Sequence, residues 1–130
     1  MEVTSKKDIR IGVIGCGRVA QHYKKILDSG VVSGFNLVGF YDLDSKRSKS
    51  FAEHFNTSIY SSFYELITSA NPNLIIILTP SGAHYKHSKE ALEKGYNVLV
   101  EKPITMLPEQ TDELKGIADS KGLMYGVSFQ

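Results

Sequence analysis

Hydrophobic residues in this chain gather in short runs, and segments with apolar positions three or four apart separate the runs. The runs predict buried parallel strands at 9–14, 35–41, 58–60, 74–78, 97–100 and 124–129. The amphipathic segments predict helices at 19–28, 43–55, 62–69, 85–94 and 108–120. Because strand and helix alternate strictly, the pattern predicts an α/β fold with a doubly wound parallel sheet of six strands.

The first predicted strand runs directly into a glycine-rich turn, in which Gly15, Gly17 and Ala20 have the G-x-G-x-x-G/A spacing of a dinucleotide-binding Rossmann turn. Gly15 lets the chain leave the strand tightly, and Gly17 lets a pyrophosphate approach the backbone. The unpaired N–H groups at the helix start then face the anion. The candidate phosphate-binding residues are therefore Gly15, Cys16, Gly17, Arg18 and Val19.

Asp42 ends the second predicted strand and follows Ala20 by 22 positions, close to the spacing of a ribose-binding carboxylate. A carboxylate there accepts hydrogen bonds from both ribose hydroxyls and repels a 2′-phosphate, which favours NAD over NADP. Two alternatives stay open. Asp42 could cap the next helix, a role for which Asp44 competes, and Lys46 and Arg47 could hold the 2′-phosphate of NADP.

The fourth predicted strand ends in Thr79-Pro80-Ser81-Gly82-Ala83-His84, a loop expected beside the nicotinamide half of the cofactor. Thr79, Pro80, Ser81 and His84 are candidate contacts, and the alternative for His84 is a first-turn residue bonded to the backbone. His87 lies three residues further on, but no carboxylate or cysteine stands at ligand spacing, so no metal site is predicted. Cys16 is interpreted as a small residue in a crowded turn, because no partner base is indicated.

The fifth predicted strand ends in Glu101-Lys102-Pro103. A charged pair directly after a buried strand is costly, which favours a functional role. The ammonium of Lys102 could polarise a substrate hydroxyl or carbonyl. The alternative is a surface lysine paired with Glu101, and the sequence leaves open whether the peptide before Pro103 is cis.

These three motifs, in this order and spacing, resemble the Gfo/Idh/MocA oxidoreductases, and the resemblance covers residues 9–130. It implies NAD(P)-dependent hydride transfer on sugars, inositols and related polyols, with Lys102 as the active-site lysine and Glu101 in the cofactor pocket. It also implies that Asp42 binds the adenosine ribose and that Gln130 lies near the nicotinamide. The Thr-Pro-Ser-Gly segment at 79–82 resembles the branch that oxidises nucleotide-linked amino sugar acids.

At 130 residues the chain has the length of one domain, interpreted as an NAD(P)-binding domain over residues 1–130. The family's second domain, which binds substrate, is absent from this sequence. We therefore expect an N-terminal fragment that binds dinucleotide and is inactive alone. The last predicted strand should lie at the edge of the sheet, which leaves a homo-oligomer open.

Composition narrows the partners. Net charge is +1 with both signs interspersed, which argues against nucleic acid and membrane surfaces as partners. The apolar runs are too short to span a membrane, the N-terminus lacks the apolar core of a signal peptide, and the single cysteine fits a reducing cytoplasm. Two other functions remain, a non-catalytic dinucleotide-binding module and an S-adenosylmethionine-dependent methyltransferase domain, and neither needs Lys102.

Overall fold

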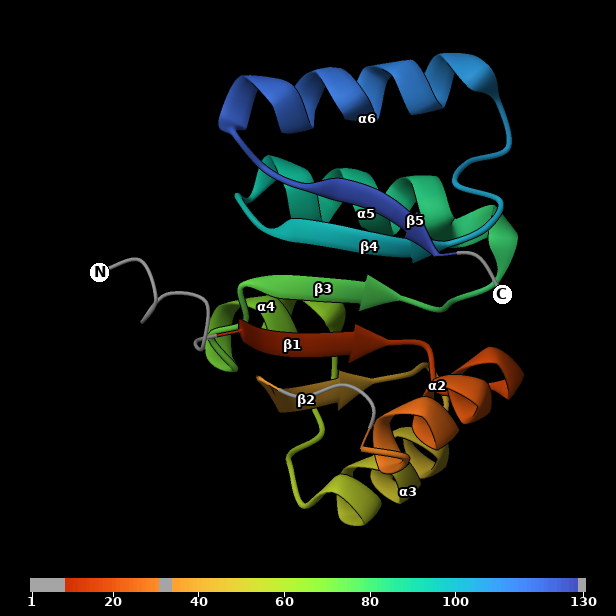
Figure 1. Ribbon diagram of the computed structural model, residues 1–130, viewed down its shortest axis with the longest axis vertical. Coiled ribbons are helices and arrows are strands. Elements are labelled where there is room, and N and C mark those ends of the chain that lie inside the picture. The colour runs from red at the N-terminus through yellow and green to blue at the C-terminus, as the bar shows by residue number, and fades with distance from the viewer. Residues whose placement is uncertain (1–8, 31–33, 129–130) are drawn as a thin grey trace.

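The computed structural model describes residues 9–30 and 34–128 and shows one parallel sheet with helices on both faces (Figure 1). The strands are β1 (Ile9–Ile14), β2 (Phe35–Tyr41), β3 (Leu74–Ile77), β4 (Asn97–Glu101) and β5 (Tyr125–Ser128). The helices are α2 (Arg18–Asp28), α3 (Ser45–Phe55), α4 (Phe63–Ser69), α5 (His84–Glu93) and α6 (Pro108–Lys121), with a 3-10 turn, η1 (Ser81–Ala83), before α5. The doubly wound α/β architecture predicted from the alternation is confirmed.

The sheet order is β2-β1-β3-β4-β5, so the chain moves outward from β1 to β2 and then crosses to the other side of β1. The connections that leave β1 and β3 therefore diverge to opposite faces. This divergence opens a crevice at the carboxyl ends of the two neighbouring strands, where doubly wound sheets bind their ligands.

The prediction of six strands is wrong, because the described sheet has five. Residues 58–60 form only an isolated parallel bridge, between Ile59 and Phe40, on the outer side of β2. Two backbone hydrogen bonds of 3.0 Å support it, from Phe40 N–H to Ser58 O and from Tyr60 N–H to Phe40 O. The chain then turns at once into α4, whose N-cap is Ser62, and too few residues remain for a strand.

Two apolar layers hold the helices to the sheet, as the alternation along each strand requires. Ile75 and Ile77 point to the face covered by α4, α5 and α6, and Ile76 points to the face covered by α2 and α3. All three isoleucines are buried. The run 74–78 is apolar throughout because both of its faces are covered, which is usual for a central parallel strand.

Local signals set the ends of the helices. Asp44 caps α3 by accepting a hydrogen bond from Lys46 N–H at 3.0 Å, so the helix begins at Ser45 and not at residue 43. Pro108 occupies the first turn of α6, and Gly122 ends that helix in the left-handed conformation. No helix in the described ranges is both long and apolar enough to cross a membrane.

At the far end of the described sheet, β5 pairs with β4 alone, as the sequence predicts for an edge strand. An unpaired strand edge can accept a further chain. Self-association of this domain through β5 stays a prediction.

Candidate functional site

A cavity of about 830 Å³ lies at the carboxyl ends of the central strands, over the crevice between β1 and β3. Residues from four strand ends and the loops after them line it. The cavity brings together most of the residues singled out in the sequence: Gly15, Gly17, Arg18, Val19, Asp42, Thr79, Pro80, Ser81, His84, Glu101 and Lys102. Cys16 lies buried behind this lining, and Gln130 lies outside the described residues.

The two glycines of the turn after β1 have different roles. Gly15 has φ +95°, and a Cβ built there would lie 2.5 Å from the carbonyl carbon of Leu78. Only glycine fits there, because a side chain would be strained and would collide with the backbone after β3. Gly17 has φ −91°, and among the described residues beyond its chain neighbours only Arg47 Nη1 lies within 4 Å of a Cβ built there, at 3.6 Å. Gly17 therefore leaves open space beside the backbone.

That open space lies at the start of α2. Gly17 is the N-cap of α2, no side chain caps the helix, and its first turn holds no acidic residue. The N–H groups of this first turn have no side-chain acceptor, and the helix dipole adds positive potential there. The turn therefore suits a negatively charged group, and the diphosphate of a dinucleotide fits it.

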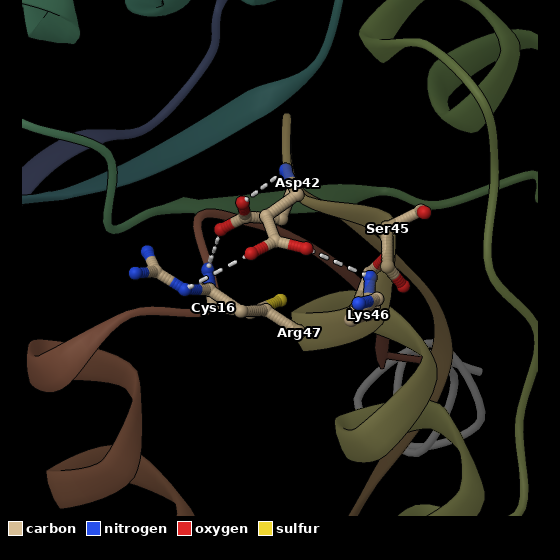
Figure 2. A network of polar contacts seen from close by, with 7 residues as sticks. Cys16, Asp42, Ser45, Lys46 and Arg47 are labelled. Carbon is tan, nitrogen blue, oxygen red and sulfur yellow. Dashed lines mark hydrogen bonds and ion pairs between the residues drawn. The ribbon is translucent and has the colours of Figure 1, made fainter.

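Figure 2 shows how Asp42 joins this turn to the start of α3. Asp42 Oδ2 accepts a hydrogen bond from Cys16 N–H at 2.6 Å, and its Oδ1 accepts one from Asp44 N–H at 2.7 Å. Asp42 does not cap α3, because Asp44 does. Each carboxylate oxygen has a second lone pair, so Asp42 is held in one orientation and can still accept from a hydroxyl in the cavity.

Arg47 reaches back from α3 over the same turn. Its Nε lies 3.7 Å from Asp44 Oδ2, and its Nη1 lies beside the open space at Gly17. This guanidinium is thus a second positive group next to the start of α2. The sequence raised Lys46 and Arg47 for the 2′-phosphate of NADP, and of these two residues Arg47 lines the cavity.

Cys16 has a structural role. Its side chain is 2% exposed, and burial together with the charge of Asp42 raises the pKa of the thiol to about 12, despite an opposing effect of Arg47. The thiol is therefore protonated at neutral pH and is a poor nucleophile. This agrees with its interpretation as a small residue in a crowded turn.

The loop after β3 is fixed by two histidines of α5 that hold Thr79. Thr79 O lies 2.7 Å from His84 Nε2, and Thr79 Oγ1 is hydrogen-bonded to His87 Nδ1 at 3.1 Å. His84 Nδ1 lies 2.7 Å from Pro103 O. Both ring nitrogens of His84 thus face backbone carbonyls, which favours the alternative of a residue bonded to the backbone over a direct contact to the cofactor.

Glu101 and Lys102 lie at the end of β4 but in different environments. Glu101 is 7% exposed and accepts a hydrogen bond of 3.4 Å from the Tyr23 hydroxyl of α2. Lys102 is exposed, lines the cavity and has no ion pair with Glu101 or any other described residue. The alternative of a lysine paired with Glu101 is therefore not what the structure shows. The peptide between Lys102 and Pro103 is cis.

Within the described ranges, no three His, Cys, Asp or Glu side chains are grouped so that they could hold a metal ion. The polar groups of the cavity instead match a dinucleotide. The N–H groups at the start of α2, the oriented carboxylate of Asp42 and the side chain of Lys102 lie after different strands on this cavity.

Comparison with known proteins gives the family. Residues 9–129 match the family described as "Oxidoreductase family, NAD-binding Rossmann fold", the Gfo/Idh/MocA family. The chain belongs to this oxidoreductase family. The resemblance inferred from the three motifs is confirmed, and the matched family binds NAD. Membership in an oxidoreductase family leaves no support for the methyltransferase alternative.

Two relatives act on sugars. The chain is 28% identical over 120 residues to glucose-6-phosphate 3-dehydrogenase of Bacillus subtilis, a match that covers 92% of this chain and 33% of that protein. It is 29% identical over 124 residues to D-glucoside 3-dehydrogenase of Escherichia coli, covering 93% of this chain and 34% of that protein. The chain thus spans about a third of the length of these relatives.

One solved structure is similar to this chain over nearly the whole of its length. The WlbA dehydrogenase of Chromobacterium violaceum, crystallised with NADH and UDP-GlcNAcA, superposes with a TM-score of 0.86 at 27% identity. That match covers 94% of this chain and 35% of the dehydrogenase chain. The shared part therefore makes up about a third of that dehydrogenase chain.

The NAD-binding domain also has cavity residues that the sequence analysis did not select as cofactor contacts: Tyr41, Leu43, Asp44, Phe63, Leu78, Ala83, Lys86, His87 and Glu90. The sequence offers a signal for Leu43, because an apolar residue directly after Asp42 interrupts a polar segment. In the structure Leu43 is 94% exposed. Phe63 and His87 meet edge to face, with ring centroids 5.4 Å apart. They come from α4 and α5, and only the fold brings them together.

The stability of the NAD-binding domain should depend on His87 in mildly acidic solution. Burial and then the charges of Lys86 and His84 lower the pKa of His87 below its ordinary 6.5. Below pH 6.5 the unfolded chain therefore binds more protons at His87 than the folded chain does, and the free energy of unfolding falls as the pH drops through the folded pKa. Above pH 6.5 this contribution is fully present.

Urea unfolding at several pH values between ~7.5 and ~5 checks this dependence. We expect His87→Gln to flatten the loss of stability below pH 6.5 relative to the unchanged chain. His22→Gln is the control, because His22 is exposed on α2. If the His87→Gln protein loses stability with falling pH as steeply as the unchanged chain, His87 does not cause this pH dependence.

Proposed function

We propose that this domain holds NAD(H) for hydride transfer to or from a carbon of a sugar, nucleotide sugar or polyol. The observation that carries the proposal is the joining, in one cavity, of the open turn at Gly17, the oriented carboxylate of Asp42 and the side chain of Lys102. The sugar substrates of the relatives support the substrate class. The remaining two thirds of such an enzyme would supply the surface that binds the substrate.

Each group has a defined part in this proposal. The N–H groups at the start of α2 bind the cofactor diphosphate, with Arg47 beside them. Asp42 accepts from the adenosine ribose. Residues 79–81 and Glu101 border the site further along, and Gln130 is proposed at the nicotinamide end. The bound nicotinamide supplies the chemistry of gaining or losing a hydride.

Lys102 is the proposed catalytic residue. Its exposed ammonium stands at the end of β4 on the cavity. A fixed positive charge there stabilises the negative charge that develops on a substrate oxygen when a hydroxyl is oxidised or a carbonyl is reduced. Lys102 can also pass a proton between that oxygen and solvent. A non-catalytic dinucleotide-binding module would have no use for this side chain.

Cofactor titrations test the proposal on this chain alone. We expect NADH to bind at least about tenfold more tightly than NADPH, because the 2′-phosphate would meet the carboxylate of Asp42. S-adenosylmethionine should not bind. Fluorescence or calorimetric titration measures all three ligands, and equal or tighter binding of NADPH would contradict the assignment of Asp42.

Charge variants of two aspartates sharpen this test. Asp42→Asn should narrow the difference between NADH and NADPH, since it removes the charge and keeps one acceptor oxygen. Asp119→Asn on the exposed side of α6 is the matched control and should leave both affinities unchanged. If Asp42→Asn lowers both affinities equally, Asp42 serves only to hold the turn.

A further inference from the structure

His84 is a buried group that the proposed function does not use. It is the first residue of α5, and its side chain is 2% exposed. Its two ring nitrogens face in different directions, Nε2 toward Thr79 O and Nδ1 toward Pro103 O, each at 2.7 Å. The ring therefore spans the loops that follow β3 and β4.

The chemistry of these partners is unusual for a histidine. Both are backbone carbonyl oxygens, which only accept hydrogen bonds. A neutral imidazole donates from one nitrogen, whereas an imidazolium donates from both. Two contacts of 2.7 Å in a buried position are both satisfied only if both nitrogens donate.

Ionisable groups surround this position on several sides. Lys86, His87 and Glu90 come from α5 itself, and Glu101 and Lys102 come from the end of β4. All of them line the same cavity as His84.

We propose that His84 is a positioning residue: by donating from both ring nitrogens it ties the cofactor-binding loop at Thr79 to the segment that carries Lys102. Pro103 directly follows Lys102, so a restraint on Pro103 O also restrains the backbone from which the lysine projects. The hydroxyl oxygen of Thr79 is hydrogen-bonded to His87, so the residue that His84 contacts is itself held in place. We call this link through the two ring nitrogens the clamp. The clamp itself follows from the observed contacts alone, whereas its benefit to Lys102 rests on the proposed function.

Two amide variants separate the halves of the clamp. The side-chain N–H₂ of asparagine can replace Nδ1 as donor, and that of glutamine can replace Nε2. His84→Asn should therefore keep the contact to Pro103 O and lose the one to Thr79 O, and His84→Gln should do the reverse. His22→Gln on the exposed part of α2 is the control.

Nuclear magnetic resonance of the 15N-labelled chain at neutral pH measures both predictions. We expect the wild-type His84 ring to show protons on both nitrogens. His84→Asn should shift backbone signals of Thr79 and Ser81 more than those of Ile104 and Thr105, and His84→Gln should show the opposite pattern. A variant that unfolds is recognised by its collapsed spectrum, and the protonation of the wild-type ring then decides alone.

Cofactor affinity gives the functional readout. Losing the Thr79 contact in His84→Asn should weaken NADH binding by about tenfold, and His84→Gln should change it less. A wild-type ring with one protonated nitrogen, or the same set of shifted signals in both variants, would overturn the clamp. If the side-specific shifts appear but the wild-type chain does not bind NADH, the clamp stands and the proposed function fails.

Discussion

Valine at position 17 is expected to abolish dinucleotide binding while the domain stays folded. The branched side chain would fill the open space where the cofactor diphosphate meets the start of α2. Loss of two charge-assisted hydrogen bonds to phosphate should weaken NADH by about a hundredfold or more. The fold should tolerate the change, because the φ of Gly17 is negative and, within the part of the chain that the structure describes, its Cβ position meets only Arg47 Nη1 beyond its chain neighbours. Calorimetric titration and thermal unfolding measure the two effects.

Two other glycines supply the comparisons for this experiment. Gly116→Val makes the same substitution on α6, where no described atom beyond its chain neighbours and the backbone of the helix itself lies within 4 Å of the added Cβ, and should leave NADH binding unchanged. Gly15→Ala should instead destabilise the domain by about 2–4 kcal/mol, because the left-handed φ and the contact with Leu78 both oppose a side chain. If the Gly17→Val protein binds NADH with the wild-type Kd, the turn has no part in cofactor binding.

Lys102→Ala is expected to lower the kcat of a full-length dehydrogenase carrying this domain by about two orders of magnitude or more. The variant removes the positive charge that the cavity holds at the end of β4. The Kd for NADH should change much less, since the proposed diphosphate and ribose sites follow β1 and β2 and not β4. Steady-state kinetics with sugar or polyol substrates and a cofactor titration separate the two effects.

A control variant and the 130-residue chain itself make this experiment decisive. Lys115→Ala removes the same charge from the exposed surface of α6 and should leave kcat unchanged. The 130-residue chain itself should bind NADH and turn over no sugar, because it spans about a third of the length of its relatives. Near-normal turnover by the Lys102→Ala enzyme would remove Lys102 from the mechanism, and robust turnover by the short chain would show that it needs no other domain.

Most of the fold could be predicted because each element carries its own signal. The continuous apolar run at 74–78 is readable as a strand covered on both faces, and Ser62, Pro108 and Gly122 mark helix ends through their own chemistry. The short segment at 58–60 was the exception. Whether three residues form a strand depends on the length of the adjoining edge and on how soon the next helix begins.

Part of the candidate site could likewise be predicted from the sequence, and part could not. Its motif residues were recognisable from spacing, because parallel strands carry their functional groups at their carboxyl ends. The part of the cavity wall formed by Phe63 and His87 could not be recognised from the sequence, because two helices distant in the sequence build it. Sequence also left the role of His84 open. Only the packed loops show that two carbonyls occupy its nitrogens.

By itself, the sequence determined the alternating architecture, the dinucleotide turn and the order of the three motifs. These depend on local periodicity, on glycine at fixed positions and on residues that directly follow strands. Tertiary structure alone decided which atoms these two glycines face: a Cβ would collide with the backbone of Leu78 at Gly15 and would meet open space at Gly17. It also decided that Asp42 orients the turn while Asp44 caps the helix. The physical reason is that such roles depend on which atoms lie within a few ångströms, and those atoms come from segments far apart in the chain.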